Sequence, residues 1–283
     1  MLFLILILSL LSVKGRSDSD AARQFGEFHK LEVAQGRHVR QQVENSNKLD
    51  LERRLVPYWD GNETFTGYLA YDKTTSTQRP VVLVVHDWNG RDEFENGKAE
   101  ALAKLGYIGF AIDLFGRTGE NPDENIELMK PFRENRQFLL RRLQLAADKV
   151  KNISVVDHLR LGAIGFCFGG MGVLDIARAG WDFKGVVSFH GSLNAPPQQQ
   201  SVPIKAKILV LHGHDDPLIK PSAVQALKEE LTKRKADWQV HIYSNTVHGF
   251  TEPTQNSTRS MYNPLSDKRS WLAMKHFLQE IFA

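Results

Sequence analysis

The chain has 283 residues, 42% of them hydrophobic and 24% charged, and its formal net charge is +3. These proportions are those of an ordinary globular protein, and the charges are spread along the chain, so nothing predicts binding to nucleic acid or to a membrane surface. The single cysteine excludes an intramolecular disulfide, so the fold must rest on its hydrophobic core.

The N-terminus carries an aliphatic run that is too short to span a membrane. Leu2 to Val13 is almost wholly apolar, whereas a transmembrane helix needs about 20 residues, and small residues follow around Gly15. We predict a signal peptide over residues 1–15 and a secreted or lumenal protein. Because the run contains no Lys or Arg, an uncleaved anchor, a mitochondrial route and a cytoplasmic location remain alternatives. Three glycosylation triplets in turn-like stretches agree with secretion, and they begin at Asn62, Asn152 and Asn256.

Residues 16–50 are polar with scattered apolar positions, and we interpret them as an N-terminal extension. No change in composition marks a second core after them, so residues 51–283 are predicted to form one catalytic domain. Its first elements are expected at residues 54–59 and 65–71. The turn signal Asp60-Gly61-Asn62 joins them, which predicts an antiparallel strand pair at the sheet edge.

Apolar strands then alternate with helices along the rest of the chain. Pro80 to His86 is a continuous apolar run, which is typical of a central parallel strand buried on both faces. A loop is expected at 113–125. Further strands are predicted at 107–112, 159–164, 186–190, 207–212 and 238–243, and helices at 91–105, 127–151, 170–178, 221–234 and 268–282. This order predicts an α/β fold with a mostly parallel central sheet and helices on both of its faces.

The run Gly165-Phe166-Cys167-Phe168-Gly169 lies where a strand turns into a helix, which is the context of the nucleophile elbow in α/β-hydrolases. Such a turn strains its central residue, and side chains at Gly165 or Gly169 would collide with neighbouring elements. The N–H groups at the helix N-terminus stabilise a thiolate at this place. Cys167 is therefore the predicted nucleophile, and the alternative is an inert core cysteine.

A thiol nucleophile needs a base and a third group that orients the base, and in α/β-hydrolases an acid and then a histidine follow the nucleophile. Asp216 follows a buried strand, and His248 follows the last strand. The predicted triad is Cys167, Asp216 and His248. Asp215 competes as the acid, but the Asp-Pro turn favours Asp216.

His212 and His214 beside two aspartates also resemble a metal cluster. We disfavour this interpretation because Gly213 is expected to break the strand, so the two histidines would not share a face. No metal and no cofactor are predicted. His86 and His190, each at the end of a strand, are interpreted as packing or pocket-wall residues.

Acyl transfer also needs N–H donors for a developing oxyanion. One donor should be the backbone N–H of Phe168, directly after the nucleophile, and the other should come from the loop after His86. We nominate the backbone N–H of Trp88 for the second position.

Five segments together resemble the dienelactone hydrolase (carboxymethylenebutenolidase) family, from about Tyr58 to the C-terminus. GFCFGG at residues 165–170 is the most specific of them. The others are Val84 to Trp88, Gly213 to Ile219, Val247 to Phe250, and Tyr262-Asn263 with Arg269-Ser270-Trp271. The resemblance implies a single-domain α/β-hydrolase without a large lid that opens lactones and enol esters with a Cys-Asp-His triad.

The resemblance has two departures at the predicted site. The family usually carries a glutamate that interacts with the cysteine before substrate arrives, and Asp87, one methylene shorter, stands at that place. We interpret Asp87 as an acid that modulates the thiol. Many relatives also have a second tryptophan where this chain has Asn89.

These residues predict a hydrolase of carboxylic esters, including lactones and enol esters, that acts through a thioester on its cysteine. The same triad would suit a general carboxylesterase or thioesterase. A non-catalytic secreted binding protein and a redox-sensing thiol protein are alternatives of another class, although no second cysteine is present to resolve a sulfenic acid. We expect a monomer whose partner is a small ester or lactone substrate, with no nucleic acid and no membrane beyond the signal segment.

Overall fold

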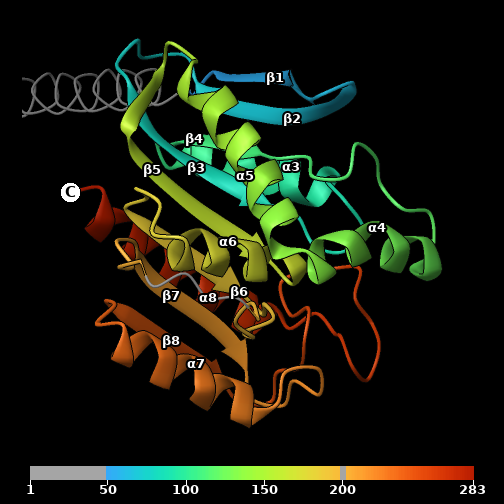
Figure 1. Ribbon diagram of the computed structural model, residues 1–283. Helices are drawn as coiled ribbons and strands as arrows, with labels where there is room; N and C mark the ends of the chain where they lie inside the picture. The colour runs from blue at the N-terminus through green and yellow to red at the C-terminus, as the bar shows by residue number, and fades with distance from the viewer. Residues whose placement is uncertain (1–48, 198–201) are drawn as a thin grey trace, which may run out of the picture. The chain divides into compact units, whose positions relative to one another are not determined.

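One β-sheet organises the computed structural model, which describes residues 49–197 and 202–283. Asp50–Ala283 form one unit. Within the described ranges, eight strands follow the order β1-β2-β4-β3-β5-β6-β7-β8 across the sheet (Figure 1). The strands are β1 (Leu51–Asp60), β2 (Glu63–Asp72), β3 (Arg79–Val85), β4 (Ile108–Ala111), β5 (Val156–Phe166), β6 (Gly185–Phe189), β7 (Lys207–Gly213) and β8 (Trp238–Tyr243). The predicted signal peptide and nearly all of the predicted extension lie outside the described residues.

The predicted antiparallel strand pair lies at one edge of this sheet. β1 pairs with β2 from Leu51 opposite Asp72 to Asp60 opposite Glu63. Gly61 in the connecting turn has a φ of +61°, a left-handed conformation that glycine adopts without a Cβ clash. β2 pairs antiparallel with β4, and every neighbouring pair from β4 to β8 is parallel. The predicted α/β fold with a mostly parallel sheet is confirmed.

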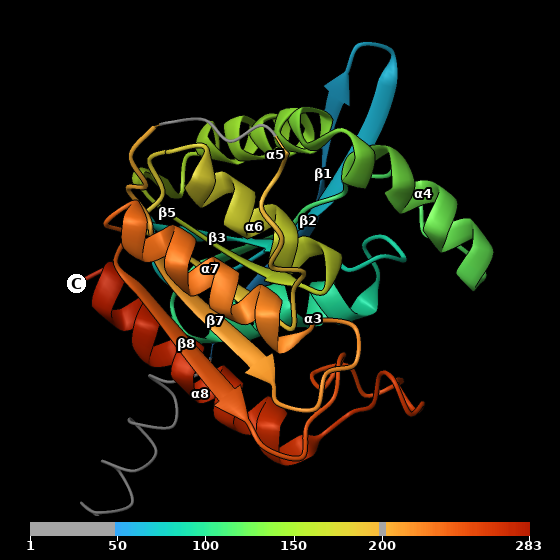
Figure 2. The same ribbon diagram turned by 60° about the horizontal axis from the view of Figure 1, so that its bottom comes forward.

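Helices cover both faces of the sheet (Figures 1 and 2). One face is covered by α5 (Arg136–Lys151), α6 (Phe168–Arg178) and α7 (Pro221–Lys233), and the other by α3 (Glu93–Lys104) and α8 (Pro264–Ile281). Strand β3 is buried along its whole length, as predicted for a central parallel strand. Its side chains alternate between the two cores, with Val81, Leu83 and Val85 in one and Val82 and Val84 in the other.

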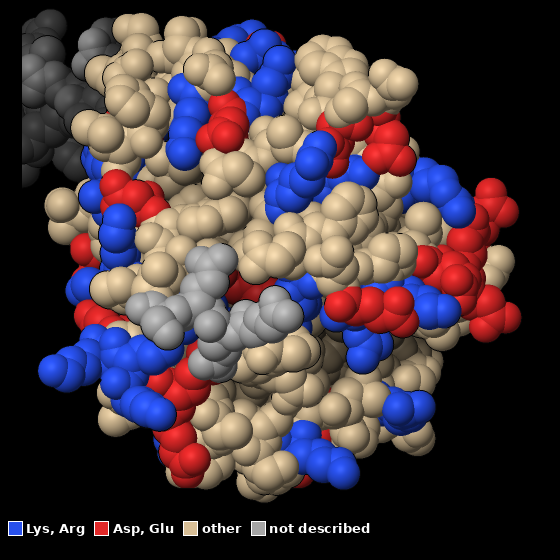
Figure 3. Space-filling model, viewed as in Figure 1, with Lys and Arg blue, Asp and Glu red and all other residues tan. Residues whose placement is uncertain are grey.

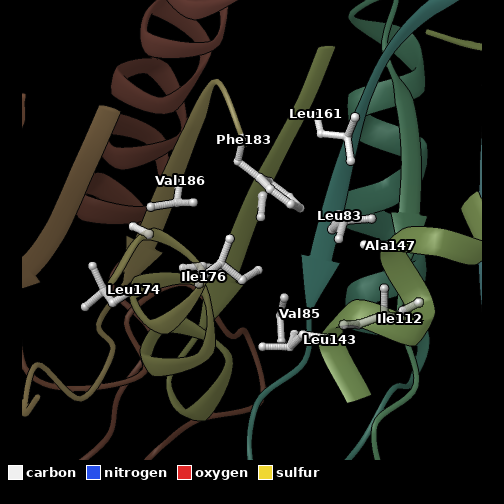
Figure 4. Close-up of a cluster of buried hydrophobic side chains, with 14 of the residues drawn as sticks. Leu83, Val85, Ile112, Leu143, Ala147, Leu161, Leu174, Ile176, Phe183 and Val186 are labelled. Atoms are coloured by element: carbon white, nitrogen blue, oxygen red, sulfur yellow. The ribbon is translucent and has the colours of Figure 1, made fainter. Parts of the chain in front are cut away.

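The larger core fixes the helix that carries the predicted elbow (Figure 4). Leu174 and Ile176 of α6 and Leu143 of α5 are each 1% exposed or less. They belong to the same buried cluster as Leu83 of β3 and Val186 of β6. Burying one such side chain contributes about 1.5–3 kcal/mol relative to leaving it in water. Packing on this scale holds the N-terminus of α6, and with it Cys167, against the sheet.

The single helix predicted over residues 127–151 is wrong, because the chain forms α4 (Pro122–Glu134) and α5 with a break at Asn135. Asn135 is extended, with φ −121° and ψ 91°, and its side chain accepts a hydrogen bond from the Phe138 N–H. Pro131 lies inside α4, and its carbonyl accepts the Asn135 N–H at 2.9 Å. An asparagine that caps α5 therefore overrides the hydrophobic period that runs through it.

Several other boundaries differ from the prediction, including the start of α4 at Pro122 inside the predicted loop at 113–125. Strand β7 includes Gly213, which was expected to break it. Helix α8 begins at Pro264, earlier than the predicted Lys268, because Asn263 caps it by accepting the N–H groups of Leu265 and Ser266.

Charged side chains of both signs are interspersed on the face viewed in Figure 3, in line with the small net charge. Within the described ranges, the longest and most apolar helices fall short of what a membrane crossing requires.

Candidate active site

Cys167 occupies a sharp turn between β5 and α6. Its φ is 49° and its ψ is −108°, a backbone conformation that residues other than glycine rarely adopt. Its N–H donates to the Phe189 carbonyl at 3.0 Å, which ties the turn to β6. A Cβ added at Gly165 would overlap the backbone of Gly169, and a Cβ at Gly169 would overlap the carbonyl oxygens at the end of β3. Backbone contacts therefore set the turn, and they require both flanking glycines, as the sequence predicts.

Cys167, His248 and Asp216 lie in one line of hydrogen bonds. The Sγ of Cys167 is 3.1 Å from Nε2 of His248, and Nδ1 of His248 is 2.8 Å from Oδ2 of Asp216. The three residues follow β5, β8 and β7, so the carboxyl ends of parallel strands bring them together. The other oxygen of Asp216 accepts the N–H groups of Leu218 and Ile219 at 2.8 and 3.1 Å. Both oxygens of the carboxylate thus accept hydrogen bonds, which fixes its orientation.

Burial separates Asp216 from its competitor. Asp216 is 6% exposed and faces His248, whereas Asp215 and His214 are exposed on the same turn. Asp215 contributes its backbone N–H to the Thr246 carbonyl at 3.0 Å. In the part of the chain that the structure describes, no three His, Cys, Asp or Glu side chains are grouped to hold a metal ion.

The environment of His248 favours its protonated form. Burial alone would lower the pKa of His248, which is 5% exposed. The charge of Cys167 and the hydrogen bonds to Asp216 and Cys167 oppose this effect and raise the pKa to about 10. An imidazolium with both N–H groups donating, one to sulfur and one to carboxylate, fits these distances. The site therefore places a positive charge between the sulfur of Cys167 and the carboxylate of Asp216.

The segment after β3 lies against the elbow. The backbone of Gly169 is in close contact with the carbonyl oxygens of Val85 and His86, so the first turn of α6 abuts the start of this loop. Phe168 is the first residue of α6, and Trp88 is partly buried against the core. The two predicted oxyanion donors thus belong to adjacent segments of backbone.

Asp87 lies in the same loop and does not bond the sulfur. Its Oδ1 accepts the Asn89 N–H at 3.0 Å, and within the described residues the hydrogen-bond partner of Cys167 Sγ is His248. Burial and the negative charges of Asp92 and Glu252 raise the pKa of Asp87 to about 7. Asp87 therefore changes its charge near neutral pH, close enough to His248 for the two charges to interact.

His86 holds the loop in place, as a packing residue would. Its Nε2 accepts the Leu114 N–H at 3.1 Å, so the ring proton is on Nδ1, which donates to the Asp87 carbonyl at 2.7 Å. Burial lowers the pKa of His86, which keeps the ring neutral. The histidine joins the ends of β3 and β4 beneath the predicted oxyanion loop.

Sequence reasoning assigned His190 to the pocket wall and did not single out Thr251. In the structure the ring of His190 contacts the ring of His248, and its Nε2 is 2.8 Å from Oγ1 of Thr251. One signal was available, because His190 directly follows the strand next to the elbow strand, at the edge where the three predicted triad residues gather.

Comparison with known proteins identifies the family of this chain. Residues 65–282 match the model of the dienelactone hydrolase family. A crystal structure of a dienelactone hydrolase-like promiscuous phosphotriesterase, P91 from metagenomic libraries, is 32% identical, with a TM-score of 0.79 over 82% of this chain and 99% of that one.

Two curated relatives are also similar. An uncharacterised protein of Caenorhabditis elegans is 35% identical over 150 residues, which are 50% of this chain and 93% of that protein. A protein of Aquifex aeolicus named "Putative carboxymethylenebutenolidase" is 28% identical, over 79% of this chain and 97% of its own length. With the family model covering most of the chain, this protein belongs to the dienelactone hydrolase family of the α/β-hydrolase superfamily and is a hydrolase of the ester and lactone class.

Proposed function

We propose that this protein hydrolyses carboxylic esters, with lactones and enol esters as its preferred substrates, through a thioester on Cys167. One observation carries the proposal, namely the alignment of sulfur, imidazole and carboxylate at 3.1 and 2.8 Å on a nucleophile elbow. In this proposal Cys167 is the nucleophile, His248 the general acid and base, and Asp216 the group that orients His248.

The reaction begins with a thiolate. Cys167 attacks the carbonyl carbon, and the backbone N–H groups of Phe168 and Trp88 donate to the oxyanion of the tetrahedral intermediate. The intermediate collapses as its C–O bond breaks, and Nε2–H of His248 gives its proton to the departing alkoxide or enolate. The acyl group remains on sulfur as a thioester, and His248 is now neutral.

Hydrolysis of the thioester returns the enzyme to its starting state. Neutral His248 takes a proton from water at Nε2, and the hydroxide formed attacks the thioester carbonyl. The C–S bond breaks, the carboxylic acid product leaves, and the thiolate is again paired with the imidazolium. Asp216 holds Nδ1–H throughout, so the ring presents Nε2 to sulfur and water in both steps.

The thiolate sets the substrate class. It is a better leaving group than an alkoxide, so the tetrahedral intermediate returns to substrate unless the departing oxygen is also a good leaving group. Enol esters, strained lactones and aryl esters meet this condition, and amides do not. The name of the Aquifex aeolicus relative, which refers to a butenolide lactone, supports the same choice.

The test is a substrate panel with purified protein. We expect turnover of enol lactones and p-nitrophenyl esters, little or none of matched amides, and a covalent acyl adduct of Cys167 in rapidly quenched mass spectra. Cys167→Ala should retain the fold and lose both turnover and adduct. Full activity in that variant, or turnover of amides at the rate of esters, would refute the proposed chemistry.

A general carboxylesterase or thioesterase with the same triad is the second candidate. An alkyl ester or an acyl thioester turned over faster than every lactone in the panel would favour it. A neutral aryl phosphotriester belongs in the panel as well, because the relative P91 is named as a promiscuous phosphotriesterase.

A further inference from the structure

His190 stands in a strained and buried position beside the proposed triad. It is 2% exposed, and its φ is 39°, in the left-handed region that residues with a side chain rarely adopt. It directly follows β6, and Cys167, whose φ is also positive, directly follows the neighbouring β5. Strain of this kind persists only where the surrounding structure holds the residue in place.

The surroundings that hold His190 come from the loop that carries His248. The centroid of its ring is 5.2 Å from the ring of His248, at 64° between planes, and 5.1 Å from the ring of Phe250, at 79°. Its Nε2 is 2.8 Å from Oγ1 of Thr251. Gly249, with a φ of +62°, turns the backbone between these contacts. Three of the four residues from 248 to 251 thus touch one imidazole.

The backbone of this loop is held from the other side. The carbonyls of His248 and Phe250 accept the N–H groups of Met261 and Asn263 at 3.0 and 3.1 Å. The path of the chain therefore does not depend on His190. What His190 contacts directly is the ring of His248, which is also hydrogen-bonded to Cys167 and Asp216.

The charge of His190 fits a supporting role. Burial lowers its pKa well below the ordinary value, and the positive charges of His248 and Lys98, with His212 nearby, act in the same direction. A neutral imidazole can pack edge to face against an imidazolium without repulsion and still make one hydrogen bond. A phenylalanine would offer the ring alone. The other nitrogen, Nδ1, has no hydrogen-bond partner in the described part of the chain.

We propose that His190 is a positioning residue, which sets the ring orientation of His248 through their ring contact while its hydrogen bond to Thr251 anchors it. The inference rests on the proposed function for its effect on turnover. Its effect on the thiol can be measured without any substrate, because the chain has a single cysteine.

Two conservative variants test the hydrogen bond from both ends. His190→Phe keeps a ring and removes the bond, and Thr251→Val keeps the shape of the side chain and removes the hydroxyl. Thr232→Val, on an exposed threonine of α7, is the matched control. Each variant is examined for kcat and KM on an aryl ester, for thermal stability, and for the rate of thiol alkylation by iodoacetamide from pH 4 to 9.

We expect kcat to fall about tenfold in both variants with KM within about twofold, as one lost hydrogen bond implies. The alkylation rate at pH 6 should fall about tenfold, and the midpoint of its pH profile should move up by about one unit. The kcat of the double variant should be no lower than that of the less active single variant, because both changes remove the same hydrogen bond.

If both variants keep the wild-type alkylation profile and kcat within about twofold, the positioning role is refuted, even where the melting temperature falls. If the wild-type protein hydrolyses no ester but the alkylation profiles shift as expected, the positioning of His248 stands and the proposed function fails. If either variant does not fold, the other still decides the matter.

Discussion

Asp216→Asn tests how much the carboxylate contributes to the proposed chemistry. The substitution keeps the size of the side chain, and an amide oxygen can still accept the N–H groups of Leu218 and Ile219. What it removes is the negative charge 2.8 Å from Nδ1 of His248. The variant therefore isolates the electrostatic part of the contact from its packing.

The pKa of His248 gives the scale of the effect. It is raised from 6.5 to about 10, against the opposing effect of burial, by the charges and hydrogen bonds of Cys167 and Asp216. That rise corresponds to about 5 kcal/mol of stabilisation of the imidazolium, to which both Cys167 and Asp216 contribute. A hydrogen bond to a charged group contributes about 1.5–3 kcal/mol, so its loss lowers kcat/KM by about 10- to 100-fold. An asparagine NH₂ turned toward Nδ1 would also force the wrong tautomer, so we expect a total loss between about 10² and 10⁴-fold.

The assay is steady-state hydrolysis of a p-nitrophenyl ester from pH 6 to 9. Asp215→Asn is the control, because Asp215 is exposed on the same turn and should keep kcat/KM within about twofold. Circular dichroism and thermal melting would show that both variants fold. If Asp216→Asn retains activity within threefold, or if Asp215→Asn is the more damaging change, the assignment of the acid is wrong.

Three further predictions concern the nucleophile, the neighbouring acid and the N-terminus. Cys167→Ser should fold normally but lose about 10²-fold or more in kcat/KM, since the site is tuned for a thiolate; unchanged kinetics would contradict this. Asp87 has a folded pKa of about 7, above its unfolded value, so the stability it contributes is present at low pH and lost as pH rises through 7. We therefore expect the free energy of unfolding of Asp87→Asn, relative to that of wild type, to rise by about 1 kcal/mol or more from pH 4.5 to pH 8.5, as measured by urea unfolding. If the stabilities of the two proteins depend on pH in the same way, the assignment is refuted. In a glycosylating host the protein should lose its leader near Gly15 and carry glycan on at least one exposed triplet, read as a mass shift after glycosidase treatment; cytosolic protein with Met1 intact would overturn it. The triplets begin at Asn62, Asn152 and Asn256.

The strands could be predicted because their sequence signal is local. The apolar run of β3 and the turn at Gly61 are each predicted by a few neighbouring residues, and the structure contains both. The elbow could be predicted for the same reason. The two glycines on either side of Cys167 stand where backbone atoms pack too closely for a Cβ.

The break between α4 and α5 was not predicted, although Pro131 and Asn135 signalled it, because the hydrophobic period continues through both helices. Helical periodicity indicates which face of a helix is buried, whereas a cap depends on a single hydrogen bond between one side chain and one backbone N–H. The place of His190 at the end of a strand was predicted, but the residues that it contacts were not. Its contacts join residues 58 and 61 positions apart in the sequence, and no local pattern encodes such a pairing.

The elbow also bears on how such a protein can evolve. The backbone of Gly165 and Gly169 packs closely against neighbouring backbone, and these contacts set the turn. On the proposed mechanism, a substitution at Cys167 would therefore exchange the attacking atom while these backbone contacts stay in place. The nucleophilic atom could then change without loss of the fold, and one scaffold could carry different reactive side chains.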